Sequence, residues 1–165
     1  MNTVNLRTQL RASDRQSIGE ITASSGFFTP AEVKIALSVF DDAMSGAEDY
    51  RYILAESDGK VVGYACFGHD EQTIDSYELY WIAVSDTQRG KGIGKLLLGA
   101  VEARITADGG GRLYIETAGR DQYLPTRRFY EEQGYDLVAN LEDYYAPGDA
   151  RVIYARRAPP PSSRP

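Results

Sequence analysis

The sequence has little of several residue types on which protein function often depends. It contains one cysteine and one histidine, which excludes an intrachain disulfide and leaves a zinc site dependent on carboxylates. Positive charge is also scarce, because 18 Lys and Arg stand against 24 Asp and Glu and give a formal net charge of -6. An acidic chain disfavours nucleic acid or an anionic membrane as its main partner, since both attract basic surfaces.

Long hydrophobic runs are missing as well. A membrane-spanning helix needs about 18 consecutive apolar residues, and no such run is present. The stretch from Met1 to Arg15 is too polar for a signal peptide, so we expect a reduced, cytoplasmic protein. The length of 165 residues predicts a single domain over residues 1–157, followed by a disordered Pro-rich tail over residues 158–165.

The hydrophobic spacing predicts a mixed succession of strands and helices. Strands are expected over residues 4–10, 52–56, 61–68, 77–84, 112–117, 135–141 and 152–156, and helices over residues 14–24, 30–45, 93–107 and 126–133. Residues 142–150 are expected to form a loop. Only residues 77–117 have the strand–helix–strand order of a parallel crossover. The order therefore predicts an α/β fold with a mixed, mostly antiparallel sheet around that crossover, flanked by helices.

The most informative segment is the glycine-rich turn between the expected strand and helix of this crossover. It reads Arg89-Gly90-Lys91-Gly92-Ile93-Gly94 and is followed by Lys95. Small residues let main-chain amides approach a ligand closely, and a helix N-terminus offers unpaired N–H groups. With cations gathered at this point of an acidic chain, the turn predicts a phosphate or pyrophosphate site.

Two familiar phosphate-binding loops do not match this turn. A Walker A loop needs four residues between its glycines and a hydroxyl after its lysine, whereas Leu96 follows Lys95 here. A dinucleotide fingerprint needs a third glycine at the position that Lys95 occupies. Both readings are therefore excluded.

Two segments resemble a known family. The pattern Arg89-x-x-Gly92-x-Gly94 is similar to the acetyl-CoA motif of the GNAT superfamily of N-acetyltransferases, which is Gln/Arg-x-x-Gly-x-Gly/Ala. The stretch TRRFYEEQGYDL, residues 126–137, resembles the family's later Phe/Leu-Tyr-Glu-x-x-Gly-Tyr/Phe segment. The expected element order also fits the family over residues 4–156, so the resemblance implies the GNAT fold.

The resemblance implies acetyl-CoA as cosubstrate, with no metal. It places the pyrophosphate on the amides of the turn and the pantetheine arm along the main chain of the preceding strand, where that strand splays from its parallel neighbour. The implied cofactor-binding residues are Ile82, Ala83, Val84, Arg89, Gly90, Lys91, Gly92, Ile93, Gly94, Lys95, Thr126 and Tyr130. The family often has an asparagine near the start of the second helix, where this sequence has Thr126, which we expect to cap that helix and contact the cofactor.

The implied reaction is direct attack of a neutral amine on the thioester of acetyl-CoA. Such a reaction needs a base for the ammonium proton and an acid for the departing thiolate. The resemblance makes Tyr130 the general acid, with a half-buried core tyrosine as its structural alternative. Glu78 and Glu116 are equal candidates for the base, beside a water chain or no dedicated base.

The acceptor is expected to be a primary amine of a small molecule or a peptide. Tyr144 and Tyr145 resemble a tyrosine pair in family members that acetylate protein N-termini, although exposed aromatic residues at a turn explain them equally well. Two other functions stay open: a CoA-binding regulatory module without turnover, and transfer of another acyl group. A homodimer is one expected assembly of this family.

Overall fold

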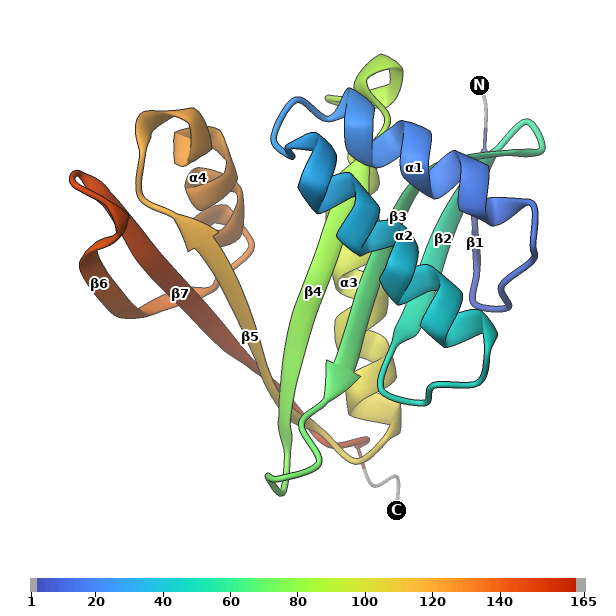
Figure 1. The fold of residues 1–165 in the computed structure, drawn as a ribbon. Helices are drawn as coiled ribbons and strands as arrows, with labels where there is room; N and C mark the ends of the chain where they lie inside the picture. Colours follow the sequence, from blue (N-terminus) through green and yellow to red (C-terminus); the bar gives the residue numbers. More distant parts are fainter. Residues whose placement is uncertain (1–2, 163–165) are drawn as a thin grey trace. The chain divides into compact units, whose positions relative to one another are not determined.

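A computed structural model describes residues 3–162 of the chain (Figure 1), and its contacts divide into two compact units. Unit 1 holds the residues up to Gly68 together with Tyr80–Glu102, and unit 2 holds His69–Leu79 and the residues from Ala103 onward. The end of the predicted tail, residues 163–165, lies outside the described part. Within residues 3–162, no helix is both long and apolar enough to cross a bilayer.

Unit 1 contains the N-terminal strands and helices. Its elements are β1 (Val4–Arg7), α1 (Asp14–Ser24), α2 (Pro30–Met44), β2 (Arg51–Ser57), nearly all of β3 (Lys60–His69), the second half of β4 (Ser76–Val84), the 3-10 turn η1 (Asp86–Gln88) and most of α3 (Ile93–Ala107). Strand β2 pairs antiparallel with both β1 and β3. These pairs agree with the mostly antiparallel sheet expected from the sequence.

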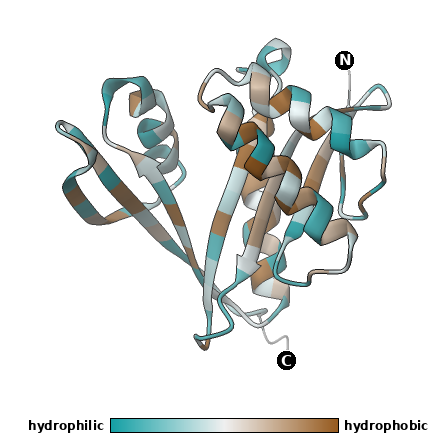
Figure 2. Ribbon diagram, in the orientation of Figure 1, coloured by the Kyte–Doolittle hydropathy of each residue, from teal (hydrophilic) through white to brown (hydrophobic). Residues whose placement is uncertain are grey.

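Local sequence explains where the elements of unit 1 begin and end. The Thr29 side chain accepts the Glu32 amide and the Glu32 carboxylate accepts the Thr29 amide, a capping box that starts α2. Asp58 and Gly59 have φ angles of 52° and 75°, which a two-residue hairpin turn between β2 and β3 requires. Figure 2 shows hydrophobic and hydrophilic residues alternating around α2, as expected for a helix with one buried face.

The core of unit 1 lies between the two N-terminal helices and the sheet. Helices α1 and α2 cover one face of the strands and α3 covers the other (Figure 1). The first layer contains the buried cluster Ile18, Ile21, Phe40, Tyr52, Leu54, Tyr64, Cys66 and Ala83. On the other face, a Cβ atom at Gly63 would lie 3.2 Å from side-chain atoms of Ile93 and Leu97, so this glycine lets α3 approach β3.

Unit 2 contains the C-terminal half of the chain. Its elements are the first half of β4, the end of α3, β5 (Gly111–Ala118), the 3-10 turn η2 (Asp121–Tyr123), α4 (Leu124–Glu132), β6 (Asp136–Ala146) and β7 (Asp149–Ala158). Residues Ser76–Leu79 pair in parallel with Arg112–Ile115, and β7 pairs antiparallel with β5 and β6. The strand order β1-β2-β3-β4-β5-β7-β6 confirms a mixed, mostly antiparallel sheet with one parallel crossover.

Two expectations for unit 2 are wrong in detail. The expected loop over residues 142–150 belongs mostly to strands, because β6 continues to Ala146 and β7 begins at Asp149. Asp143, with a φ angle of 53°, accepts the Gly148 amide and shapes the turn between them. Helix α4 begins at Leu124 rather than at Thr126, since η2 leads directly into it.

Candidate functional site

The glycine-rich turn of unit 1 exposes main-chain groups at the start of α3. Gly90 and Gly92 have φ angles of 75° and 77°, and a Cβ atom at either would meet no atom within 4 Å beyond its chain neighbours. Conformation, not crowding, therefore requires these glycines. The Leu96 amide donates to the Gly92 carbonyl at 3.0 Å, so the amides of residues 93–95 precede the first helical hydrogen bond. The turn is thus open to an anion.

The cations around this turn differ in what they contact. Arg89 donates to the Ser25 carbonyl, and its guanidinium lies 5.5 Å from the centre of the Phe27 ring. Arg89 therefore fastens the turn to the end of α1, besides bringing its charge. Lys91 is exposed and donates to the Gln88 side chain at 3.1 Å, and Lys95 is exposed on the first turn of α3.

The main-chain amides at the end of β4 face alternately toward β3 and away from it. The Ser85 amide donates to the Val62 carbonyl of β3 at 2.8 Å. Because successive residues of a strand direct their amides to opposite neighbours, the Ala83 amide also faces β3, while those of Ile82 and Val84 face away from it. Ile82 and Val84 belong to the strand along whose main chain the pantetheine arm was expected to bind.

Tyr130, the expected general acid, lies in the core of unit 2. Its side chain is 4% exposed, and its ring centre is 6.2 Å from that of Tyr135 and 6.0 Å from that of Tyr154. Burial raises the pKa of Tyr130 above its ordinary value, so the phenol keeps its proton at neutral pH. A protonated phenol is the form that a general acid needs.

The two candidate bases have different surroundings. Glu116, exposed on β5, accepts the Tyr145 hydroxyl at one carboxylate oxygen and Arg151 Nη2 at the other, at 2.8 Å. Glu78, exposed on β4 opposite Tyr114 in the parallel register, makes no hydrogen bond or ion pair with any other described residue. Glu78 is therefore free to receive a proton, whereas both oxygens of Glu116 already accept hydrogen bonds.

Glu116 contacts Tyr145 and Arg151, and the sequence did not indicate that these side chains would meet. Arg151 lies opposite Ala118 in the register of β5 and β7, which puts it diagonally next to Glu116. Its guanidinium lies 5.1 Å from the centre of the Tyr144 ring. A diagonal contact between strands depends on the register, which no spacing along the chain reveals.

Thr126, Cys66 and His69 have surroundings that suit a structural role. Thr126 lies inside the first turn of α4, where Tyr123 occupies the N-cap, so the expected capping role of Thr126 is wrong. Cys66 is buried in the core of unit 1, and burial raises the pKa of its thiol to about 12. His69 contacts the Ile74 carbonyl at 3.1 Å and the Tyr77 ring.

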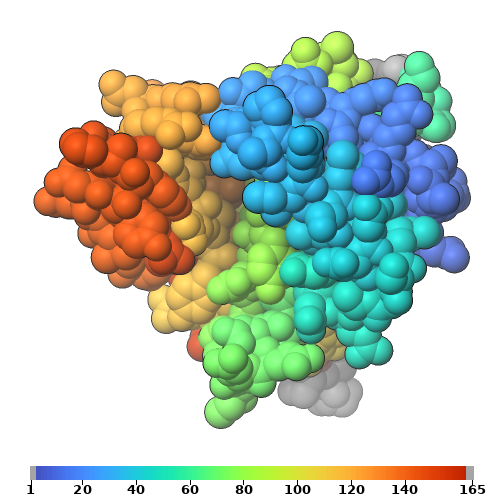
Figure 3. Space-filling view, in the orientation of Figure 1, coloured from blue at the N-terminus to red at the C-terminus, as the bar shows by residue number. Residues whose placement is uncertain are grey.

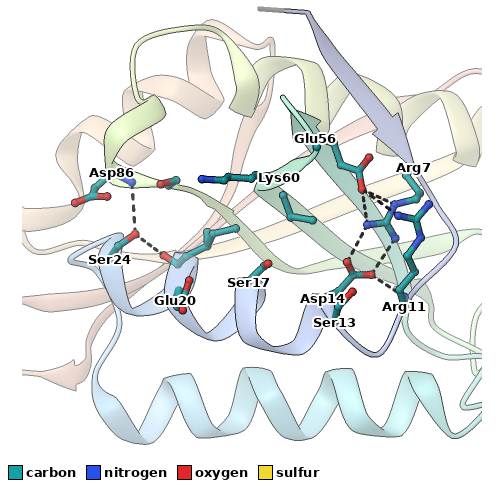
Figure 4. Close-up of a pocket in the computed structure, with 14 residues that line it drawn as sticks. Arg7, Arg11, Ser13, Asp14, Ser17, Glu20, Ser24, Glu56, Lys60 and Asp86 are labelled. Carbon is teal, nitrogen blue, oxygen red and sulfur yellow. Dashed lines mark hydrogen bonds and ion pairs between the residues drawn. The ribbon is translucent and has the colours of Figure 1, made fainter.

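Unit 1 also contains a polar pocket of about 480 Å³ that includes none of the predicted site residues (Figure 4). Glu20, Ser17 and Ser24 line it from α1, and Lys60 and Glu56 lie across from them. At one end the Arg7 guanidinium pairs with Asp14 at 2.8 Å and with Glu56 at 2.6 Å. This end of the pocket is closed by ion pairs that join β1, β2 and α1. No group of three metal-ligating side chains occurs within residues 3–162.

Comparison with known proteins gives a consistent result. Residues 20–135 match the model of the acetyltransferase (GNAT) family. A crystal structure from Desulfovibrio desulfuricans, assigned to the GNAT family, is 35% identical, with a TM-score of 0.92 over 94% of this chain and 99% of that one. No protein of curated function matches the chain by sequence.

Several more distant structures share the fold. The ribosomal-protein-S18-alanine N-acetyltransferase of Escherichia coli is 19% identical, with a TM-score of 0.76 over 99% of each chain. The aminoglycoside 6'-N-acetyltransferase of Enterococcus faecium is 15% identical, with a TM-score of 0.74 over 98% of this chain and 99% of that one. At these identities the likeness concerns the fold alone.

Proposed function

Since the chain belongs to the acetyltransferase (GNAT) family, we propose that it transfers the acetyl group of acetyl-CoA to a primary amine. The proposal depends on the open glycine-rich turn. Its main-chain amides lie at the start of α3, ahead of the first helical hydrogen bond, and Lys91 and Lys95 lie beside them. Main-chain amides at a helix N-terminus with cations nearby suit a pyrophosphate. Ile82 and Val84 are proposed to bind the pantetheine arm through their main chain.

The proposed reaction needs one base and one acid. The amine nitrogen, once neutral, forms a bond to the thioester carbon and then loses its second proton to solvent, as the carbon–sulfur bond breaks to release CoA thiolate. We assign the ammonium proton to Glu78, because it is the candidate carboxylate with no partner among the described residues. We assign protonation of the thiolate to Tyr130, because it occupies the tyrosine position of the segment that resembles the family's later motif and its phenol is protonated at neutral pH.

A primary amine as acceptor is supported by two fold neighbours. One is named for acetylation of a ribosomal-protein alanine and another for acetylation of aminoglycosides, and both substrates offer an amine. Another structure of this fold is a complex with coenzyme A. A cytoplasmic location and a homodimer remain proposals, which cell fractionation and sedimentation of the purified protein test.

The function is tested by the release of CoA thiol from acetyl-CoA with a panel of primary amines. We expect amine-dependent thiol release and a raised melting temperature in the presence of CoA, because a ligand of the folded state stabilises it. CoA binding without thiol release from any amine would indicate a regulatory module instead. Faster release from propionyl-CoA or succinyl-CoA would assign another acyl group, and no thermal protection by CoA would refute the reading of the turn.

A further inference from the structure

Four side chains gather near the C-terminal end of β5, and we call them the hairpin cluster: Glu116 of β5, Tyr144 and Tyr145 of β6, and Arg151 of β7. Tyr144 and Tyr145 are 55% and 48% exposed, and their ring centres lie 5.1 Å apart with planes at 86°. The hairpin of β6 and β7 (orange-red) lies at the surface in Figure 3. Exposed tyrosines beside an arginine form a surface suited to binding a partner molecule.

The charges within this cluster cancel. The Arg151–Glu116 pair is joined at 2.8 Å, and the two side chains are 32% and 41% exposed. The hydrogen bond to Glu116 raises the pKa of Arg151, so the guanidinium keeps its charge. Burial, followed by the hydrogen bond to Glu116, raises the pKa of Tyr145, which therefore remains a hydrogen-bond donor. The cluster consequently offers aromatic surface without a free carboxylate.

A free carboxylate at this place would have a different preference. Carboxylates in water-accessible sites attract ammonium groups, and each additional ammonium of a ligand adds to that attraction. The other carboxylates of the hairpin lie outside the cluster: Asp149 pairs with Arg120 at 3.1 Å, Asp143 accepts the Gly148 amide, and Glu142 is exposed on β6. Arg151 is thus the residue that neutralises the charge of Glu116 beside the two tyrosines.

We propose that Arg151 masks Glu116 and so makes the hairpin cluster favour acceptors with a single ammonium group over polycationic amines. This inference rests on the proposed function, since it assigns the end of β5 and the hairpin to the acceptor. Carboxyl ends of parallel strands are where ligands of α/β sheets bind, and β5 is one strand of the parallel pair in unit 2. The acceptor class that follows is a monoamine, such as an amino-acid amide or a peptide N-terminus.

The test measures spermidine binding by titration calorimetry and acetylation of alaninamide and spermidine by thiol release. Removing the mask with Arg151→Gln should tighten spermidine binding about tenfold, the effect of one charge pair at a surface, and should raise the relative rate with spermidine. The gain should shrink at high salt. Arg151→Lys keeps the charge and should stay close to wild type.

The control is Arg157→Gln, which frees Asp75 from an exposed pair of 2.8 Å in the same unit and should leave spermidine binding unchanged. In the double variant with Glu116→Gln, the gain from Arg151→Gln should vanish, because no carboxylate remains to be unmasked. Circular dichroism establishes that each variant is folded.

An Arg151→Gln variant that binds spermidine no better than wild type overturns the proposal, and so does a gain that persists with Glu116→Gln. Absence of thiol release with every amine refutes the proposed function instead. In that case the calorimetric titration with spermidine still tests whether Arg151 masks Glu116.

Discussion

The two units each hold a carboxylate between an arginine and a second donor, but they differ in exposure. In unit 1, Asp14 accepts Arg7 and the Arg11 amide, and the Asp14 and Arg7 side chains are 3% and 13% exposed. In unit 2, Glu116 accepts Arg151 and Tyr145, and it is 41% exposed. Because it is buried, the Asp14–Arg7 pair acts on the stability of the fold. The Glu116–Arg151 pair is exposed and can therefore act on a ligand.

The units also differ in which part of the chain performs the proposed work. Unit 1 offers main-chain amides in a turn shaped by glycines at positive φ. Unit 2 offers side chains, a buried phenol at Tyr130 and a free carboxylate at Glu78. Cofactor binding and proton transfer should therefore be separable by substitution.

The largest effect is expected from Tyr130→Phe. Loss of the general acid should lower kcat by about two to three orders of magnitude, with little change in CoA affinity. Because burial raises the pKa of Tyr130, the wild-type kcat should not fall from loss of this proton up to about pH 10. Stopped-time thiol assays across pH check both statements.

The matched control is Tyr154→Phe, because the Tyr154 hydroxyl donates to Glu131 at 2.8 Å within the same aromatic group. Its removal should cost about 1 kcal/mol of stability and leave kcat unchanged. Equal kcat losses in the two variants would remove Tyr130 from the chemistry and assign it to packing.

Gly92→Val should have the opposite effect to Tyr130→Phe, because it should weaken cofactor binding rather than proton transfer. A β-branched residue resists a φ of 77°, so the turn should lose the conformation that exposes its amides, and CoA affinity should fall about a hundredfold. Gly99→Ala is the control, since this glycine lies within α3 with equally open surroundings. It should leave CoA affinity unchanged and stabilise the protein by about 0.5–1 kcal/mol. Calorimetric titration with CoA distinguishes the two variants, and equal affinities would exclude the turn as the cofactor site.

The sequence predicted unit 1 more fully than unit 2, and the reason is physical. Residues 14–24 and 93–107 were expected as helices and form α1 and α3 with those bounds. Their ends are determined locally, by Gly26 after α1 and by the glycine-rich turn before α3. Helices whose ends are determined by nearby residues in the sequence can be predicted from the spacing of residue types alone.

The hairpin of unit 2 could not be predicted in the same way. Residues 142–150 contain Pro147 and Gly148 together with three acidic residues, which favours a loop. Pairing with β7 extends β6 through most of this stretch, and the register has an irregularity between Leu141 and Ala146. The contact of Arg151 with Glu116 depends on that pairing, so it lay beyond any local pattern.

The contrast between the acid–arginine pairs is tested by Asp14→Asn. Breaking a buried pair should cost about 2–3 kcal/mol in the free energy of unfolding at neutral pH. Burial alone would raise the pKa of Asp14, but the hydrogen bonds from Arg7 and the Arg11 amide lower it further, so the net shift is downward. Its contribution is therefore present above about pH 4 and is lost as the pH falls through the folded-state pKa.

Chemical denaturation at several pH values checks this prediction, with Asp41→Asn as the control. Asp41 of α2 pairs at 2.8 Å with Arg15, which lies next to Asp14 on α1, but both side chains are 51% exposed. Its loss should change stability far less. A difference between wild type and Asp14→Asn that stays constant from pH 7 to about pH 3 would contradict the ionised pair.

The smallest effect is expected from Glu78→Gln, which tests the contrast between a free and an engaged carboxylate within unit 2. Loss of the base should lower kcat about tenfold at neutral pH, because solvent still removes part of the ammonium protons. An acceptor amine of lower pKa, already neutral at the assay pH, should recover most of the rate. Glu116→Gln should act mainly on the acceptor KM, because both oxygens of Glu116 already accept hydrogen bonds. A greater loss of kcat in Glu116→Gln than in Glu78→Gln would reverse the assignment, since the engaged carboxylate would then have to release Tyr145 or Arg151 before it could take the proton.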